Sequence, residues 1–113
     1  MLKPIKRISS MLDCVFYLCS EREHKWICEV NFNKENRIGI YCRKKEFGEV
    51  IGEAIDEVVK KTQWDGLDCC RENDTDYTIF ITSKYDFSSP WLQDSFMDDL
   101  IYNLEKCNLK VDV

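Results

Sequence analysis

Apolar and polar residues alternate along two neighbouring stretches in the first half of the chain. In the first stretch the even-numbered positions are apolar: Trp26, Cys28, Val30 and Phe32. The second stretch repeats this pattern at Ile38, Ile40 and Cys42. A period of two indicates strands that bury one face. Because the polar cluster NKEN lies between the stretches, we expect a β-hairpin over residues 25–43.

The same pattern predicts the register of this hairpin. Since both buried faces are even-numbered, the numbers of two opposing residues must have an even sum. The predicted pairs are Phe32–Ile38, Val30–Ile40 and Cys28–Cys42. Directly opposed residues lie about 4.5–5.5 Å apart at Cβ. We therefore expect the thiols of Cys28 and Cys42 to be neighbours in the core.

Two more apolar runs predict strands. The run CVFYLC at 14–19 is a strand or the end of a helix that begins near Ile5, and we place a strand there. The run YTIFITS at 77–83 is rich in β-branched and aromatic residues, which favour strands. The sequence WDGLDCCRENDTD before it is read as a polar, acidic connection, and LKVDV at 109–113 as a short final strand.

A helical period follows the hairpin, over residues 46–62. At about 100° per residue, one face is apolar, with Phe47, Ile51, Ala54, Ile55, Val58 and Thr62. The opposite face is acidic, with Glu49, Glu53, Asp56 and Glu57. Gly48 and Gly52 lie together beside the apolar face, and each costs a helix up to about 1 kcal/mol relative to alanine. We expect this cost to be offset by the close approach of a neighbouring strand or helix.

A second helix is predicted over residues 90–107. Ser89 is a candidate N-cap, and Pro90 stands at the first helical position. Apolar residues recur at helical spacing, whereas Asp94 and Asp98 face the other way with Asp99 nearby. These elements predict one α+β domain over residues 1–113, with an antiparallel-rich sheet and two helices packed mainly on one face.

Charge is distributed unevenly along the chain. Residues 1–45 contain ten Lys or Arg and five Asp or Glu, whereas residues 46–113 contain six and sixteen. This acidic second part favours a cationic protein partner and disfavours direct binding of nucleic acid. No apolar run approaches the roughly 20 residues of a membrane helix. Because Asp13 interrupts the apolar N-terminal patch and no cleavage signal follows it, we expect a cytoplasmic protein.

Candidate chemistry is sparse. The odd number of cysteines, seven, has no disulfide-framework spacing, and we expect reduced thiols. The sequence contains no C-x-x-C pair, the usual ligand spacing of a structural zinc site. Of the adjacent Cys69 and Cys70, we expect one side chain to point into the core and the other to point outward. His24 is the single histidine, and no phosphate-binding or nucleophile motif is present. We expect no catalytic residues, no metal and no cofactor.

A strand followed by the stretch RKKEFGEVIGEAIDEVVKKT resembles a pattern in some bacterial immunity proteins of contact-dependent growth inhibition systems. The positions that carry the resemblance are Phe47, Gly48, Gly52, Glu53, Ala54, Ile55, Val58 and Val59. It covers about thirty residues, with Phe47 where leucine is more usual. The resemblance implies a soluble inhibitor that binds a toxin domain, often a nuclease, and blocks it without catalysis.

Candidate partner contacts come from charge geometry, because no contact residue can be carried over from that family. They are Glu49, Glu53, Asp56, Glu57, Asp65, Asp68, Glu72, Asp74, Asp76, Asp94, Asp98 and Asp99. Clustered carboxylates accelerate the encounter with a cationic partner and can mimic phosphates. Two alternatives stay open: a phage-encoded or other small inhibitor of a nucleoprotein complex, and a cysteine-rich metal- or thiol-dependent protein.

Overall fold

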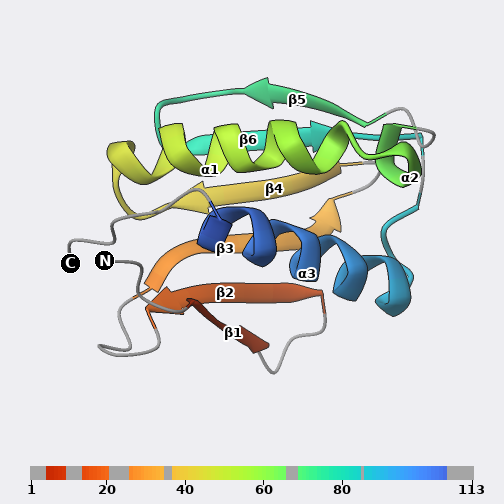
Figure 1. Ribbon diagram of the computed structural model, residues 1–113, viewed down its shortest axis with the longest axis horizontal. Helices are drawn as coiled ribbons and strands as arrows, with labels where there is room; N and C mark the ends of the chain where they lie inside the picture. The colour runs from red at the N-terminus through yellow and green to blue at the C-terminus, as the bar shows by residue number, and fades with distance from the viewer. Residues whose placement is uncertain are drawn as a thin grey trace.

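The protein is built on one antiparallel sheet. The computed structural model describes residues 5–9, 14–20, 26–34, 37–65, 69–84 and 86–106. The strands are β1 (Ile5–Ser9), β2 (Val15–Ser20), β3 (Trp26–Lys34), β4 (Arg37–Cys42), β5 (Cys70–Asn73) and β6 (Thr78–Thr82). They lie in the order β1-β2-β3-β4-β6-β5, and every neighbouring pair is antiparallel (Figure 1).

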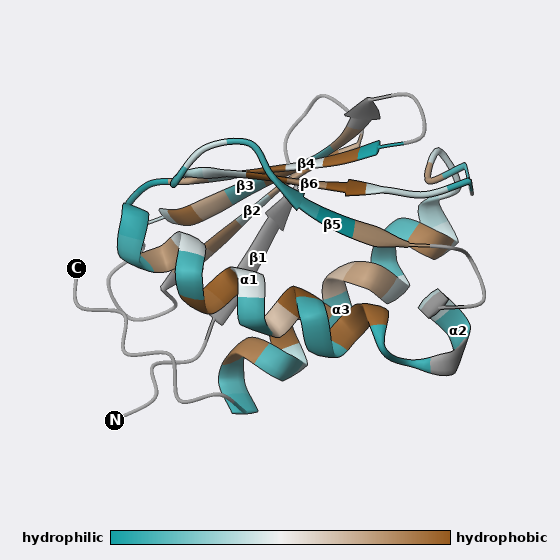
Figure 2. Ribbon diagram, turned by 90° about the horizontal axis from the view of Figure 1, so that it is seen from above, coloured by the Kyte–Doolittle hydropathy of each residue, from teal (hydrophilic) through white to brown (hydrophobic). Residues whose placement is uncertain are grey.

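The helices are α1 (Lys45–Val59), the one-turn α2 (Thr62–Asp65) and α3 (Pro90–Lys106). Both long helices lie on the same side of the sheet (Figure 2). The predicted α+β class is therefore confirmed. Neither long helix contains a segment that is apolar and long enough to span a bilayer, within the part of the chain that the structure describes.

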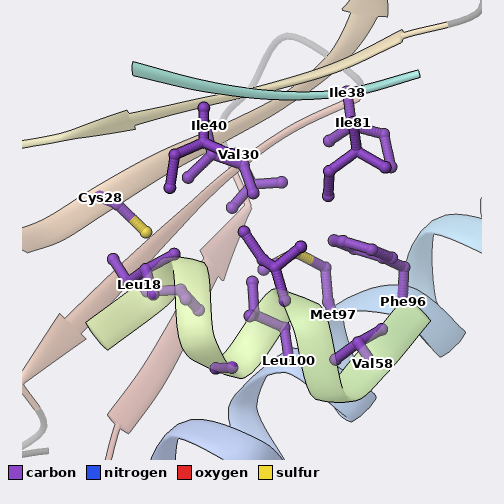
Figure 3. Close-up of a cluster of buried hydrophobic side chains, with 14 of the residues drawn as sticks. Leu18, Cys28, Val30, Ile38, Ile40, Val58, Ile81, Phe96, Met97 and Leu100 are labelled. Carbon is purple, nitrogen blue, oxygen red and sulfur yellow. The ribbon is translucent and has the colours of Figure 1, made fainter. Parts of the chain in front are cut away.

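The core lies between the sheet and the two long helices. Figure 3 shows strand side chains that face helix side chains across it, namely Val30, Ile38, Ile40 and Ile81 opposite Val58, Phe96, Met97 and Leu100. At one end, four aromatic rings form a cluster with neighbouring centroids 5.7–6.1 Å apart: Phe32, Trp64, Phe87 and Phe96. Such contacts add to the stabilisation from area burial.

The hairpin register is partly as predicted. Val30 lies opposite Ile40, and Cys28 lies opposite Cys42 with both side chains buried. The register then shifts between Asn31 and Lys34, so the predicted Phe32–Ile38 pair falls in an irregular segment. The two thiols are core neighbours, as the alternation predicted.

The prediction that the even-numbered residues of this strand all face the core is wrong at Trp26. It is 42% exposed, whereas its odd-numbered neighbour Ile27 is fully buried. The cause is a register shift at Leu18 and Cys19 of the adjacent strand, where Cys19 pairs with Trp26. A bulge of this kind reverses the facing of the side chains beyond it.

The sequence pattern did not predict two of the strands, β1 and β5. Ile5–Ser9 is a strand paired with β2, so the alternative of a helix beginning near Ile5 is wrong. The predicted polar connection contains β5, whose four residues are all exposed, and Trp64, which is fully buried in α2. An edge strand without a buried face has no apolar alternation, so periodicity could not reveal it.

The helix ends also differ slightly from prediction. The first helix ends at Val59 rather than residue 62, because Thr62 begins the separate helix α2. The second helix is described to Lys106. Cys107 and the strand expected at 109–113 lie outside the described residues, as does His24.

Candidate functional site

The two glycines of α1 let the chain after β5 come into contact with the helix. A Cβ atom on Gly48 would lie 2.5 Å from the backbone oxygen of Asp76, which is closer than a Cβ contact can be. Only glycine fits there without a shift of the backbone. The predicted close approach is therefore confirmed at Gly48, but the approaching segment is the turn between β5 and β6 rather than a strand or helix.

Gly52 contacts a side chain rather than backbone. The guanidinium of Arg71, on β5, lies directly over Gly52, where a Cβ atom would meet its Nη1. The Nε of Arg71 also lies 3.2 Å from Oδ1 of Asp56 on α1. Arg71 reaches this position because it lies opposite Ile81 in the sheet, on the side that faces the helices.

A groove of about 540 Å³ opens between α1 and the β5–β6 turn. Its lining residues are Lys45, Gly48, Glu49, Glu53, Arg71, Asn73, Asp74, Thr75, Asp76 and Ile79. Four of the twelve predicted contact residues are thus brought together from two separate segments. Pockets of this size are common at binding sites.

The carboxylates of the groove are available to a partner. Among the residues that the structure describes, the side chains of Glu49, Glu53, Asp74 and Asp76 make no hydrogen bond or ion pair. All four residues are exposed. The groove can therefore accept cationic groups, while Lys45 and Arg71 line it as the positive side chains.

Hydrogen bonds hold the turn that carries two of these carboxylates. The backbone N–H groups of Asp74 and Thr75 donate to the Thr78 carbonyl over 3.0 and 3.3 Å. The N–H of Tyr77 donates to Thr75 Oγ1 over 3.1 Å, and the Tyr77 carbonyl accepts from the N–H of Cys42 over 2.7 Å. The acids are therefore carried by a turn that is fixed to the sheet.

A second hollow, of about 410 Å³, shares Glu53 with the groove. It is lined by Glu53, Asp56, Glu57, Lys60, Asn103 and Lys106. Here the charges are largely paired: Glu57 lies 3.3 Å from Lys60, and Asp56 pairs with Arg71. The acidic stripe predicted on this helix therefore divides into an open half and a compensated half.

Asp99 has an internal role that the charge pattern did not predict. Its Oδ2 accepts a hydrogen bond of 2.6 Å from the buried indole N–H of Trp64, and Oδ1 accepts one of 2.9 Å from Lys61. Its backbone oxygen accepts from Asn103 Nδ2 over 2.8 Å. This carboxylate anchors α2 to α3 and is a poor candidate for partner contact.

The remaining predicted contacts are dispersed. Asp94 and Asp98 are exposed on α3. Glu72 lies opposite Phe80, whose neighbours Ile79 and Ile81 face the helices, so Glu72 points to the other side of the sheet. Asp68 lies outside the described residues, as does the side chain of Asp65.

Sequence reasoning missed the two cations of the groove. Lys45 precedes the predicted start of the first helix by one residue, and Arg71 lies in the strand that had no recognisable pattern. The pairing of Arg71 with Asp56 depends on the strand order, which places β5 next to β6. A charge count along the chain could not reveal that these two cations lie in the groove.

Two of the buried cysteines, Cys28 and Cys42, are poorly suited to thiol chemistry. Burial raises the pKa of Cys28 well above its usual value, with smaller contributions from Cys42 and Cys19. Burial also raises the pKa of Cys42 to about 12. Thiolates are the reactive form, so both thiols are inert near neutral pH. Cys69 is half-buried and Cys70 exposed, as predicted.

Metal ligands do not gather in the described ranges, where no three His, Cys, Asp or Glu side chains are placed to hold an ion together. No protein-family model, curated protein or solved structure matches this chain. The groove, with its four unpaired carboxylates, is the feature of the described residues that most directly suggests a binding function.

Proposed function

We propose that this protein binds a cationic partner protein in the groove between α1 and the β5–β6 turn, and that it acts by inhibition rather than catalysis. In its specific form, the proposal is an immunity protein that blocks a toxin nuclease. The observation that carries the proposal is the convergence of Glu49, Glu53, Asp74 and Asp76 on one groove without internal partners.

Electrostatics supports this choice of partner. Unpaired carboxylates that are close together repel one another, and a lysine or arginine of a partner would relieve this repulsion. Nucleases present cationic surfaces to the phosphates of their substrate, and clustered carboxylates can occupy such surfaces in the place of phosphates. Complementary charge also accelerates encounter and makes it sensitive to salt.

The shape of the groove supports specific rather than diffuse attraction. Gly48 lines the groove and leaves room for the β5–β6 turn to approach α1, and Arg71 is positioned by its contacts with Asp56 and Gly52 of α1. A cationic side chain that enters between the acids would also meet Arg71 and Lys45. These two positive charges favour partners whose cations avoid them, which gives the groove a means of selection.

A capture experiment with charge-reversed variants tests the proposal. The tagged protein, the double variant Glu49→Lys/Glu53→Lys and the matched control Glu72→Lys are used to capture partners from the native host at low and moderate salt, with identification by mass spectrometry. Asp56 is left unchanged because it pairs with Arg71. The wild type and the control should retain one basic protein in stoichiometric amount, and the double variant should lose it.

Activity of the captured protein then tests inhibition. If the partner is a nuclease, its cleavage of DNA or RNA should be blocked by the wild type and restored at least about tenfold with the groove variant. Thermal melting of each variant shows whether the fold is retained. Capture that is equal for the wild type and the groove variant would contradict the proposal, as would the absence of any stoichiometric protein.

A further inference from the structure

One edge of the sheet is open beside the groove. β5 is the last strand of the sheet, and within the part of the chain that the structure describes it pairs with β6 alone. Figure 1 shows no helix or strand beyond it. All four residues of β5 are exposed. An edge of this kind can accept an additional strand, because its outward N–H and C=O groups are free to pair with another chain.

The hydrogen bonds between β5 and β6 show which backbone groups point outward. The N–H of Asp74 donates to the Thr78 carbonyl over 3.0 Å and continues the register of the two strands, so Asp74 faces β6. Backbone groups of successive strand residues point to opposite sides. Asn73 and Arg71, one and three positions earlier, therefore direct their N–H and C=O groups to the open edge. Among the described residues, nothing forms a hydrogen bond with these four groups.

The free carboxylates of the groove lie along the same edge. Glu49 and Glu53 belong to α1, whose axis runs along β5 in Figures 1 and 2, and Asn73 lines the groove together with them. The two glutamates are four residues apart, which is a rise of about 6 Å along the helix. Side chains on one face of an extended segment repeat at about 6.6 Å. Lysines or arginines at alternate positions of a segment at this edge would thus match the two carboxylates in spacing and charge.

We infer that the partner in the proposed function, on which this inference rests, contributes an extended basic segment that pairs with β5 as an added strand. Main-chain hydrogen bonds to Arg71 and Asn73 provide affinity, and the groove acids select cationic side chains. The charge of the Arg71 side chain is met by Asp56 at 3.2 Å, so the four unpaired carboxylates outweigh the remaining cation of the groove, Lys45.

The same charges disfavour a second copy of the chain at this edge. Pairing of two β5 strands would bring the groove acids of both copies together, and like charges that face each other across an interface repel. A basic segment of another protein removes this repulsion. The occupant that fits both the open backbone and the charge is therefore a strand with lysine or arginine at alternate positions.

Hydrogen exchange with a synthetic peptide tests the pairing without knowledge of the partner. The probe is a blocked nine-residue peptide of alternating lysine and threonine, and its counterpart has glutamate in place of lysine. NMR follows amide exchange in the full chain. In the free protein, the outward amides of Arg71 and Asn73 should exchange faster than that of Glu72, which faces β6. Saturating lysine peptide should slow the exchange of both outward amides by at least about tenfold, and the glutamate peptide should leave it unchanged.

A proline in β5 separates strand pairing from charge attraction. Asn73→Pro removes an outward N–H but no hydrogen bond to β6, and edge strands tolerate proline. The matched control Asn73→Ala loses the same side chain and keeps the N–H. In calorimetry, Asn73→Pro should weaken binding of the lysine peptide by about tenfold, and Asn73→Ala by less than about threefold. Thermal melting shows whether each variant retains the fold.

The inference and the proposed function fail in different ways. If the captured partner is lost by Glu49→Lys/Glu53→Lys but retained equally by Asn73→Pro and Asn73→Ala, the groove binds without an added strand, and the inference alone is overturned. Unchanged exchange at Arg71 and Asn73 with the lysine peptide would also overturn it, as would equal peptide affinity of the two Asn73 variants. So would self-association of the wild type that Asn73→Pro abolishes in analytical ultracentrifugation, because a second copy would then occupy the edge.

Discussion

The helices α1 and α3 pack on the same face of the sheet, yet they bury different chemistry. The buried residues of α1 are all apolar or glycine: Phe47, Gly48, Ile51, Gly52, Ala54, Ile55 and Val58. Those of α3 include two amide side chains: Leu92, Gln93, Phe96, Met97, Leu100, Asn103 and Leu104. Helix α1 is therefore held against the sheet mainly by apolar packing, whereas α3 is also held by hydrogen bonds of its buried side chains.

The polar contacts of α3 reach segments that are distant in the sequence. Gln93 Nε2 donates to the Phe87 carbonyl over 2.8 Å and contacts Cys14 Sγ at 3.3 Å. Asp99 accepts from Trp64 and Lys61 beyond the end of α1. In α1, by contrast, the glycines bring the β5–β6 turn into contact and leave the acids outside. Two helices on the same face of the sheet can therefore use acidic residues in different ways.

The largest effect should come from the acid that α3 uses internally. Asp99→Ala leaves the buried indole N–H of Trp64 without its acceptor, so the free energy of unfolding should fall by about 1.5–3 kcal/mol. Glu49→Ala, at an exposed acid of α1, should change it by less than about 0.5 kcal/mol. Urea denaturation measures both. Equal losses in the two variants would remove the distinction between the internal and the exposed acid.

An intermediate effect should distinguish the two glycines of α1. Gly48→Ala places a Cβ against the Asp76 backbone, which cannot move without the turn, so we expect a net loss of about 1–2 kcal/mol despite the better helix propensity. Gly52→Ala meets only the flexible end of Arg71, so the stability should be unchanged or raised by up to about 1 kcal/mol. Thermal melting checks the sign of each change, and a stabilising Gly48→Ala would show that the turn is not held against the helix.

The smallest effect should come from the ion pair that links α1 to β5. Asp56 and Arg71 are partly exposed, so Asp56→Asn should cost less than about 1 kcal/mol at low ionic strength. In 1 M salt, where the screening length is about 3 Å, the difference from wild type should largely vanish. Urea titrations at the two salt concentrations make the comparison. A loss that persists in high salt would show that Asp56 contributes through packing rather than charge.

Local pattern was enough to predict most of the architecture. Strict alternation identified the hairpin and placed Cys28 opposite Cys42, because side-chain facing in a strand depends only on position parity. Helical spacing identified α1 and α3 for a similar reason, and the unfavourable glycines in α1 indicated a close neighbour. Each of these features depends on residues that are near one another in the chain.

Long-range packing decided the remainder. The bulge that exposes Trp26 belongs to the pairing of β2 with β3, and β5 is a strand only because β6 supplies its partner. Whether an acid is internal, like Asp99, or open, like Glu49, depends on side chains more than twenty residues away. The sequence by itself thus determined the strands with a buried face, the two long helices and the acidic excess. The groove depended on the tertiary structure, because only strand order and helix packing decide which charges are compensated within the fold.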